Sequence, residues 1–290
     1  MSSAAAFASI NLDALPKPAI VEALDFESIV SAIKADLVAR QPALAPVLAL
    51  ESEPITKLTE AFAYREILLR QRYNEEALAL TLAYAAGADL DHIGLTYYQE
   101  PRIADDETDT AYRRRLQLKP ASWSTAGPRD AYLFHALSAH ADVADAGVYS
   151  PHPGTTIVAV LGDTESGEPS AEVLAAVVAR LNTDTVRPLC ETVVVQPVQV
   201  QLYVAHVTLY TYPGADPEAK VAEATAALQT LVAQLYTVGT DVARSAIAAA
   251  AHVAGVQRVD VARPVADIVC DATQIARCTW VDVQWGGTAQ

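Results

Sequence analysis

The sequence predicts an α+β fold in which a segment built around one long helix precedes two small α+β domains. Two patterns lead to this prediction. Residues 51–94 carry charge on most turns and apolar residues three or four positions apart, as a helix requires. From Pro128 onward the pattern alternates between helix and strand. The chain has 290 residues, 52% of them hydrophobic and 19% charged, so it can build more than one core.

Composition changes along the chain divide it into four predicted segments. Residues 1-20 form an extended N-terminal segment, and residues 21-121 form a helical segment that enters a bundle. Residues 122-190 and 191-290 form a middle and a C-terminal α+β domain. A weak internal similarity between residues 135–151 and 246–264 favours two small modules over one doubly wound sheet.

The first predicted helix begins after Asp25, whose carboxylate suits an N-cap. Its apolar positions recur at helical spacing: Phe26, Ile29, Ile33 and Leu37. Gln41-Pro42 ends it, because the residue before a proline is disfavoured in helical conformation.

The long helix is predicted to start near Ser52, which can cap it, with Pro54 in its first turn. Gly87 is predicted to end it. A helix of about 32 residues would span ~48 Å, which exceeds the width of a small domain.

A thin apolar seam runs along this helix and is surrounded by arginine and glutamate side chains. A single helix with so narrow a seam cannot bury enough surface by itself, so we expect helices of other chains to cover it. The predicted partner-helix interface consists of Ile55, Leu58, Phe62, Leu69, Tyr73 and Leu80.

A short helix is predicted after Thr108, with Asp109 in its first turn and arginines in the next, as the helix dipole favours. Lys119-Pro120 stops it. Residues 122–128 are small and rich in Ser, Thr and Gly. We interpret them as a hinge centred on Ser124, Gly127 and Pro128.

The second half alternates helices and strands. We predict helices at residues 128–139, 169–181, 217–236 and 242–253, with Ser170 or the loop before it capping the second, and Thr240 or Asp241 the last. Strands are predicted at residues 143–149, 155–161, 256–262 and 278–284.

The strongest strand signal covers residues 193–212. Val198, Val200, Leu202 and Val204 alternate with polar residues and Tyr203, so one face should be buried and the other wetter. Pro197 is expected at a join between two strands or at a bulge.

Charge and hydropathy exclude several classes of partner. The formal net charge of −15 argues against nucleic acid and against an anionic membrane. No stretch reaches 18 uninterrupted apolar residues, and the N-terminus lacks a basic leader. We therefore expect a soluble protein made in the cytoplasm.

The residue types that carry chemistry are present but scattered. The 6 histidines and 3 cysteines show no zinc-ligand spacing, and we interpret Cys190, Cys270 and Cys278 as reduced core residues. No phosphate-binding glycine motif or nucleophile motif occurs. The acidic run at residues 105–109 lacks the glycine and glutamate of a calcium loop. We assign no catalytic, cofactor-binding or metal-binding residue and expect no enzyme activity.

Arg113, Arg114 and Arg115 form the main basic cluster. Consecutive residues on a helix point in different directions, so these three cannot present one phosphate-binding face. We expect them to pair with acidic neighbours or with partner chains.

Several motifs in order resemble one known family. They are ESEPITKL, AYRE, RQR, NEEA and AAGADLDHIG, then TDTAYRRRLQL, VRPL, TVVVQ and GVQRV, and finally PVADIV with TQIARCT. Together they resemble the baseplate J-like proteins of contractile phage tails, especially the branch of P2-like phages and headless R-type pyocins. The resemblance runs from about Leu24 to the C-terminus.

The resemblance implies a structural wedge protein of a six-fold baseplate. Its N-terminal helices would bundle with a helical tail protein, next to a small lysozyme-like wedge protein. Its C-terminal domains would meet further copies of the chain in a ring around the hub. No nucleic acid, membrane or cofactor is implied.

Two alternatives belong to other classes. One is a cytoplasmic assembly scaffold or adaptor that binds helices but is absent from the finished particle. The other is a hydrolase that uses dispersed carboxylates, for which no activated nucleophile or metal cluster is visible in the sequence.

Overall fold

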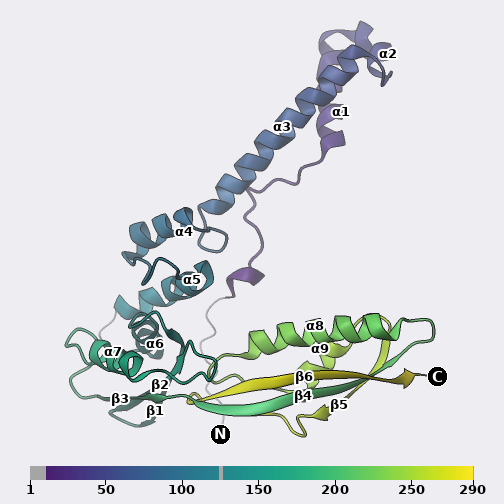
Figure 1. Ribbon diagram of the computed structural model, residues 1–290. Helices are drawn as coiled ribbons and strands as arrows, with labels where there is room; N and C mark the ends of the chain where they lie inside the picture. Colours follow the sequence, from purple (N-terminus) through teal and green to yellow (C-terminus); the bar gives the residue numbers. More distant parts are fainter. Residues whose placement is uncertain (1–10, 124–126, 290) are drawn as a thin grey trace. The chain divides into compact units, whose positions relative to one another are not determined.

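The computed structural model describes residues 11–123 and 127–289. The chain forms two compact units, one of Met1–Arg102 with Thr108–Gln117 and one of Ile103–Glu107 with Leu118–Gln290. The first is helical, and the second contains two small sheets with their covering helices (Figure 1). The predicted α+β class is confirmed. The boundaries predicted at residues 20/21, 121/122 and 190/191 remain predictions.

The first unit holds a set of helices of very unequal length. They are η1 (Leu12–Ala14), α1 (Phe26–Arg40), η2 (Pro42–Leu44), α2 (Ala45–Leu48), α3 (Pro54–Ala79), α4 (Ala88–Ile93), the π-helical turn η3 (Gly94–Tyr98) and α5 (Asp109–Leu118). Asp25 caps α1 by accepting a hydrogen bond from the Ser28 N–H, as predicted.

Helix α1 packs alongside α3 (Figure 1). Ile29 and Val30 of α1 are buried against Ala63, and Phe26, Ile33 and Ile67 cover the edges of this small cluster. The segment before α1 also follows α3, because Glu22 pairs with Arg70 and exchanges backbone hydrogen bonds with the Asn74 side chain. One side of α3 is therefore covered by residues of the same chain.

The predicted end of the long helix is wrong. Helix α3 stops at Ala79, after 26 residues, and Gly87 instead begins α4 with a φ of 52°. The hydroxyl of Thr81 donates to the Leu78 carbonyl, which competes with a continuing helix. The predicted cap is also wrong, because the N-cap residue is Glu53, without a side-chain hydrogen bond.

The described residues of the second unit form six strands and their covering helices. The helices are η4 (Lys119–Trp123), α6 (Arg129–Leu137), α7 (Ala171–Leu181), α8 (Pro217–Leu235) and α9 (Arg244–Ala251). The strands are β1 (Val143–His152), β2 (Thr155–Gly162), β3 (Thr192–Pro197), β4 (Gln199–Thr211), β5 (Val256–Arg263) and β6 (Gln274–Thr288).

The first sheet has the order β1-β2-β3, with an antiparallel and a parallel pair. Its core joins Phe134 of α6, Val158 and Val160 of β2, and Val177 and Leu181 of α7, all fully buried. Ser170 caps α7 through the Val173 N–H, in agreement with one of the two predicted caps.

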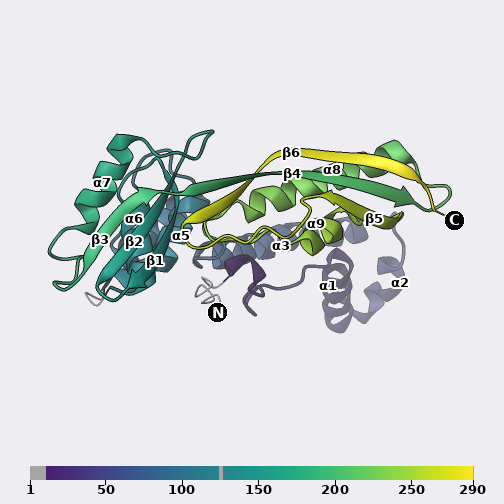
Figure 2. The ribbon, with the colours of Figure 1, turned by 90° about the horizontal axis from the view of Figure 1, so that it is seen from below.

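The second sheet has the order β5-β4-β6, with β4 antiparallel to β5 and parallel to β6. Helices α8 and α9 lie on the same side of it (Figures 1 and 2). Helix α9 begins after Ala243, so the caps predicted at Thr240 or Asp241 are wrong. Val242 instead bridges to Ile268.

The predicted inside and outside of β4 are reversed over its central part. Tyr203, Ala205 and Val207 are buried under the helices, whereas Leu202 and Val204 are exposed. Residues 202–205 are apolar on both faces of the strand, so the two-residue period does not specify which face the helices cover.

The two sheets of this unit are joined directly. Pro197 ends β3, and after Val198 the chain enters β4 of the other sheet, which confirms the predicted join. Val198 donates to the Val160 carbonyl and packs with Leu161 and Ile275 in a small buried cluster. Strand β3 pairs with β2, although it lies beyond the predicted boundary at 190/191.

Candidate interaction surfaces

The first candidate surface is an apolar stripe on α3, formed by Leu58, Phe62, Leu69 and Tyr73. Each of these side chains is between 50% and 60% exposed. Ile55 is half-buried at one end of the stripe, and Leu80, 81% exposed, lies just past the end of the helix. These six residues are the predicted partner-helix interface, which remains a prediction.

Helical geometry separates this α3 stripe from the face that contacts α1. At about 100° per residue, Leu58, Phe62, Leu69 and Tyr73 fall within ~60° of one another. The residues buried against the chain itself, Thr56, Thr59 and Ala63, lie about 100° around the helix axis. The stripe is therefore a second apolar face that the described part of the chain leaves uncovered.

Charged side chains flank the α3 stripe, and most are paired along the helix. Arg70 binds Glu66 at 2.7 Å and Arg72 binds Glu76 at 2.6 Å, both four residues apart. Arg65 forms no ion pair with any residue that the structure describes. Exposed pairs of this kind contribute little stability and mainly select the partner and its register.

A polar network fixes the segment between α3 and α5. Arg115, which is buried, forms an ion pair with Glu100 at 2.8 Å. Arg113 donates to the carbonyls of Leu82 and Ala85, where α3 has already ended. The predicted pairing with acidic neighbours is confirmed for Arg115. Arg113 instead donates hydrogen bonds to backbone carbonyls.

A second cluster in this network centres on Arg102. Its guanidinium bridges Asp91 and Asp109, both at 2.6 Å, and the other Asp109 oxygen accepts from the Gly87 N–H. This N–H first, and then Arg102, hold the pKa of Asp109 below its ordinary value. Asp109, the last residue of the acidic run at 105–109, therefore forms contacts within the fold.

The predicted hinge lies in the second unit. Ser124 is outside the described residues, and Gly127 has a φ of 65° next to Pro128, which precedes α6. The ammonium group of Lys119, which precedes the hinge, lies 4.9 Å from the centre of the Phe134 ring in α6. Residues on both sides of the predicted hinge are thus in contact.

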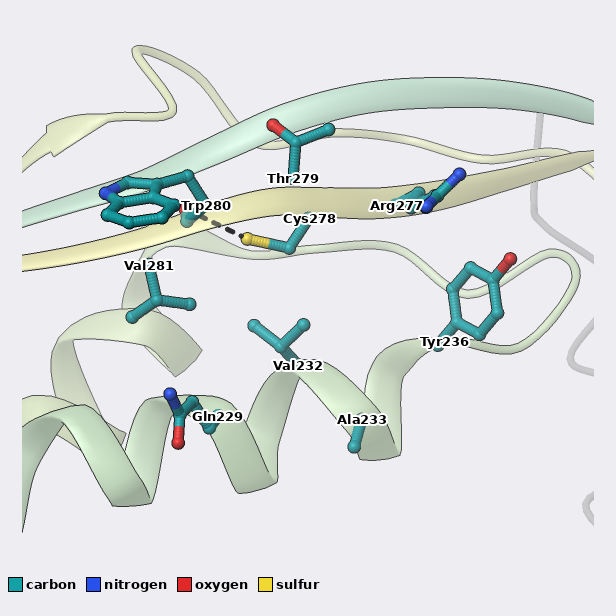
Figure 3. A pocket seen from close by; sticks show the side chains of 9 residues that line it. All are labelled: Gln229, Val232, Ala233, Tyr236, Arg277, Cys278, Thr279, Trp280 and Val281. Atoms are coloured by element: carbon teal, nitrogen blue, oxygen red, sulfur yellow. Dashed lines mark hydrogen bonds between the residues drawn. The ribbon is translucent and has the colours of Figure 1, made fainter. Parts of the chain in front are cut away.

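A groove of about 550 Å³ lies between α8 and β6, at the edge of the second sheet (Figure 3). Val232 and Ala233 of α8 and the C-cap residue Tyr236 line one wall. Residues 277–281 of the edge strand β6 line the other, and of these Cys278 and Val281 point toward α8. The Cys278 thiol donates to the Trp280 carbonyl at 3.3 Å. The lining is mostly apolar, so the groove suits an apolar side chain.

The other side of the second sheet carries an open face, formed by Leu202, Val204 and His206 of β4 with Arg277, Trp280 and Asp282 of β6. Leu202 and Trp280 are 66% and 67% exposed. A hollow of about 760 Å³ adjoins this face beside β4, bounded by residues 262–265 and Ile268. This surface was not predicted from the sequence, because Leu202 and Val204 were expected inside. The apolar residues on both faces of β4 were the available signal.

The three cysteines are free thiols. Cys270 is buried, but Cys190 is exposed, so the predicted core position is wrong for Cys190. Among residues 11–123 and 127–289, no group of three or more His, Cys, Asp or Glu side chains could hold a metal ion. Over the same residues, no helix has the length and apolar character needed to span a membrane.

Three models of one family match successive parts of the chain. The baseplate J-like N-terminal domain matches residues 51–107, the central domain residues 124–197, and the C-terminal domain residues 204–284. The chain belongs to the baseplate J-like family. Baseplate protein J of Escherichia phage P2 is 43% identical over 298 residues, which cover 96% of this chain and 98% of that protein.

The family assignment confirms the resemblance found in the sequence. In this baseplate J-like protein, the N-terminal match includes α3 and its stripe. The central match covers the first sheet, and the C-terminal match covers most of the second. The α3 stripe and the groove between α8 and β6 therefore lie in matched regions, as does the open face of the second sheet except for Leu202.

Proposed function

We propose that this baseplate J-like protein is a structural wedge component of the baseplate of a contractile tail, in a phage or an R-type pyocin. The observation that carries the proposal is an apolar stripe on α3, which the described part of the chain leaves uncovered, within a region that matches the family. An exposed stripe of this size on a helix marks a protein interface. The protein would be made in the bacterial cytoplasm and then incorporated into the tail.

The α3 stripe is proposed to bind helices of another wedge protein, the helical tail protein, next to the lysozyme-like wedge protein. Each large apolar side chain that becomes fully buried contributes about 1.5–3 kcal/mol. Phe62 and Leu69, at the centre of the stripe, would contribute most. Arg65, without an ion pair in the described part of the chain, would meet an acidic residue of the partner.

The second unit is proposed to form the contact between wedges that closes a six-fold ring. Residues 122–128 are proposed as a hinge that lets this unit turn when the baseplate opens. Motion at Gly127 would have to release Lys119 from Phe134. A disulfide engineered across the hinge should leave particles assembled but unable to contract. Normal contraction of the oxidised particles would contradict this motion.

The competing function is an assembly scaffold that is absent from the finished particle. Mass spectrometry of purified tails separates the two, because a wedge protein must remain at a fixed ratio to the other baseplate proteins. A chain that is present during assembly but missing from purified tails would contradict the proposed function.

No enzymatic role is proposed. The groove between α8 and β6 is mostly apolar, and its one thiol, Cys278, donates to a backbone carbonyl. Turnover of peptidoglycan or other glycans by the purified protein would overturn this part of the proposal.

A further inference from the structure

The outer edge of β6 has no neighbouring strand in the described part of the chain, where β6 pairs with β4 alone. A loop covers the beginning of this edge, because the Gly239 N–H donates to the Gln274 carbonyl. Beyond Ala276, the described residues supply no strand to the outer edge. Such an edge presents a row of unpaired N–H and C=O groups to any extended segment that can lie beside it.

The groove between α8 and β6 opens beside this edge (Figure 3). Cys278 and Val281 point from β6 toward α8, and Val232 lies on the helix opposite them. A strand added to the sheet would lie about 4.8 Å beyond β6, and alternate side chains would point to the same side as Cys278 and Val281. These side chains would enter the groove of about 550 Å³ and pack against α8.

The charges around the groove favour an acidic segment. Among the described residues that line it, Arg277 is the one that carries a charge, and no carboxylate is present. Arg277 forms no ion pair, hydrogen bond or ring contact with a residue that the structure describes. A segment that combines a large apolar side chain with a nearby carboxylate would match the groove in both polarity and charge.

We propose that an extended segment of another baseplate protein adds to the outer edge of β6 as a fourth strand, with a large apolar side chain in the groove and a carboxylate on Arg277. Backbone hydrogen bonds to β6 would supply affinity, and the groove would select the side chain. The β6 strand of a second copy would offer the groove only Cys278 and Val281, which are small. The inference rests on the proposed function and deepens it, because it assigns one contact of the second unit to a class of partner segment.

Photo-crosslinking in cells that produce the tails tests this contact in the full-length chain. Gln229→benzoylphenylalanine places a photoreactive group at the groove. Gln234→benzoylphenylalanine is the matched control, because Gln234 is exposed on the same helix, about 140° around its axis from Gln229. After irradiation the chain is isolated and mass spectrometry maps the cross-linked residues. The Gln229 variant alone should cross-link to one segment of another baseplate protein, with alternating apolar residues and an Asp or Glu.

Two further substitutions test the groove itself. Ala233→Asp places a carboxylate in the apolar groove, and Arg277→Glu reverses the charge at its edge. Each should lower the yield of the Gln229 cross-link at least about tenfold. Gln234→Asp introduces the same carboxylate one residue along the helix, outside the groove, and should leave the yield unchanged. Ala233 is exposed, so Ala233→Asp keeps the test available if Arg277→Glu does not fold.

Hydrogen exchange distinguishes an added strand from a docked helix. The probe is a synthetic peptide with the sequence of the cross-linked segment, added to the purified full-length chain. An added strand should slow exchange at backbone amides of β6 between residues 276 and 285, because these amides would gain acceptors. A helix lying in the groove would leave the outer amides of β6 open to water.

Four results would overturn the inference. They are no Gln229 cross-link above the Gln234 control, a cross-link to a second copy of this chain, a yield that does not respond to Ala233→Asp or Arg277→Glu, and unchanged exchange in β6 with the peptide. None of these bears on the proposed function, which depends on the presence of the chain in purified tails. Because irradiation precedes purification, the cross-link can be read even if the chain is absent from finished tails.

Discussion

The carboxylate of Asp145 in the first sheet accepts a hydrogen bond from the Val238 N–H next to the second sheet, at 2.9 Å. The same side chain also accepts from the Ala146 N–H, and Asp145 is 4% exposed. A Cβ atom added to the nearby Gly147 would lie 1.8 Å from the Ala272 carbonyl oxygen. The two sheets therefore meet in a close contact that tolerates little change.

Replacement of Asp145 by Ala should destabilise the second unit. The buried Ala146 N–H and the half-buried Val238 N–H would lose their acceptor, at a cost of about 1–3 kcal/mol. Urea unfolding of the purified chain measures this, with Asp142→Ala as the control because that carboxylate is exposed. Equal midpoints for Asp145→Ala and the unmodified chain would show that the carboxylate does not join the sheets.

Substitution within the α3 stripe should abolish assembly without unfolding the chain. Phe62→Asp or Leu69→Asp changes an exposed side chain, so the free energy of unfolding should move by less than about 0.5 kcal/mol. Burial of the new carboxylate against a partner helix would be unfavourable, so the variants should be missing from purified tails.

Tyr64→Asp is the matched control for these two variants. Tyr64 is an exposed aromatic residue of α3, about 200° around the helix from Phe62. Tails containing Tyr64→Asp should form normally. Normal tails with Phe62→Asp would mean that the stripe is not the partner interface.

Removal of Arg115 should destabilise the first unit strongly. Arg115→Ala would leave the largely buried Glu100 carboxylate without its partner, at a cost of about 3–5 kcal/mol. Arg65→Ala, on the exposed side of α3, should change the isolated chain very little. Comparable unfolding midpoints for the two variants, measured by circular dichroism in urea, would argue against an essential buried pair.

The Asp109 contact should make the stability of the first unit depend on pH. The folded pKa of Asp109 lies below its ordinary value of about 3.9, so the carboxylate stabilises the fold at pH above that value. This contribution should disappear as pH falls through the folded pKa. Urea unfolding of the unmodified chain and of Asp109→Asn at pH 7 and near pH 3 should show a difference that shrinks in acid. A constant difference would exclude Asp109 as the titrating group.

The sequence predicted most of the elements because their signals are local. Asp25 and Ser170 cap helices, Pro197 separates two strands, and Lys119-Pro120 ends α5, each through the chemistry of one or two residues. The seam of α3 was visible for the same reason, since helical spacing alone places Leu58, Phe62, Leu69 and Tyr73 on one face.

Other features depended on residues distant in sequence. Residues 80–87 were predicted as helix, yet Arg113 donates to the Leu82 and Ala85 carbonyls from 31 and 28 residues away. The predicted partner-helix interface included Leu80. Because α3 ends at Ala79, Leu80 lies outside the helix.

By itself, the sequence determined the α+β class, the family and the apolar face of α3, because periodicity, caps and ordered motifs are properties of neighbouring residues. The tertiary structure alone decided which side of β4 is covered, because Leu202 to Ala205 are apolar on both faces and only the packing of α8 and α9 selects one. That selection buries Tyr203 and leaves Leu202, Val204 and Trp280 exposed between Arg277 and Asp282.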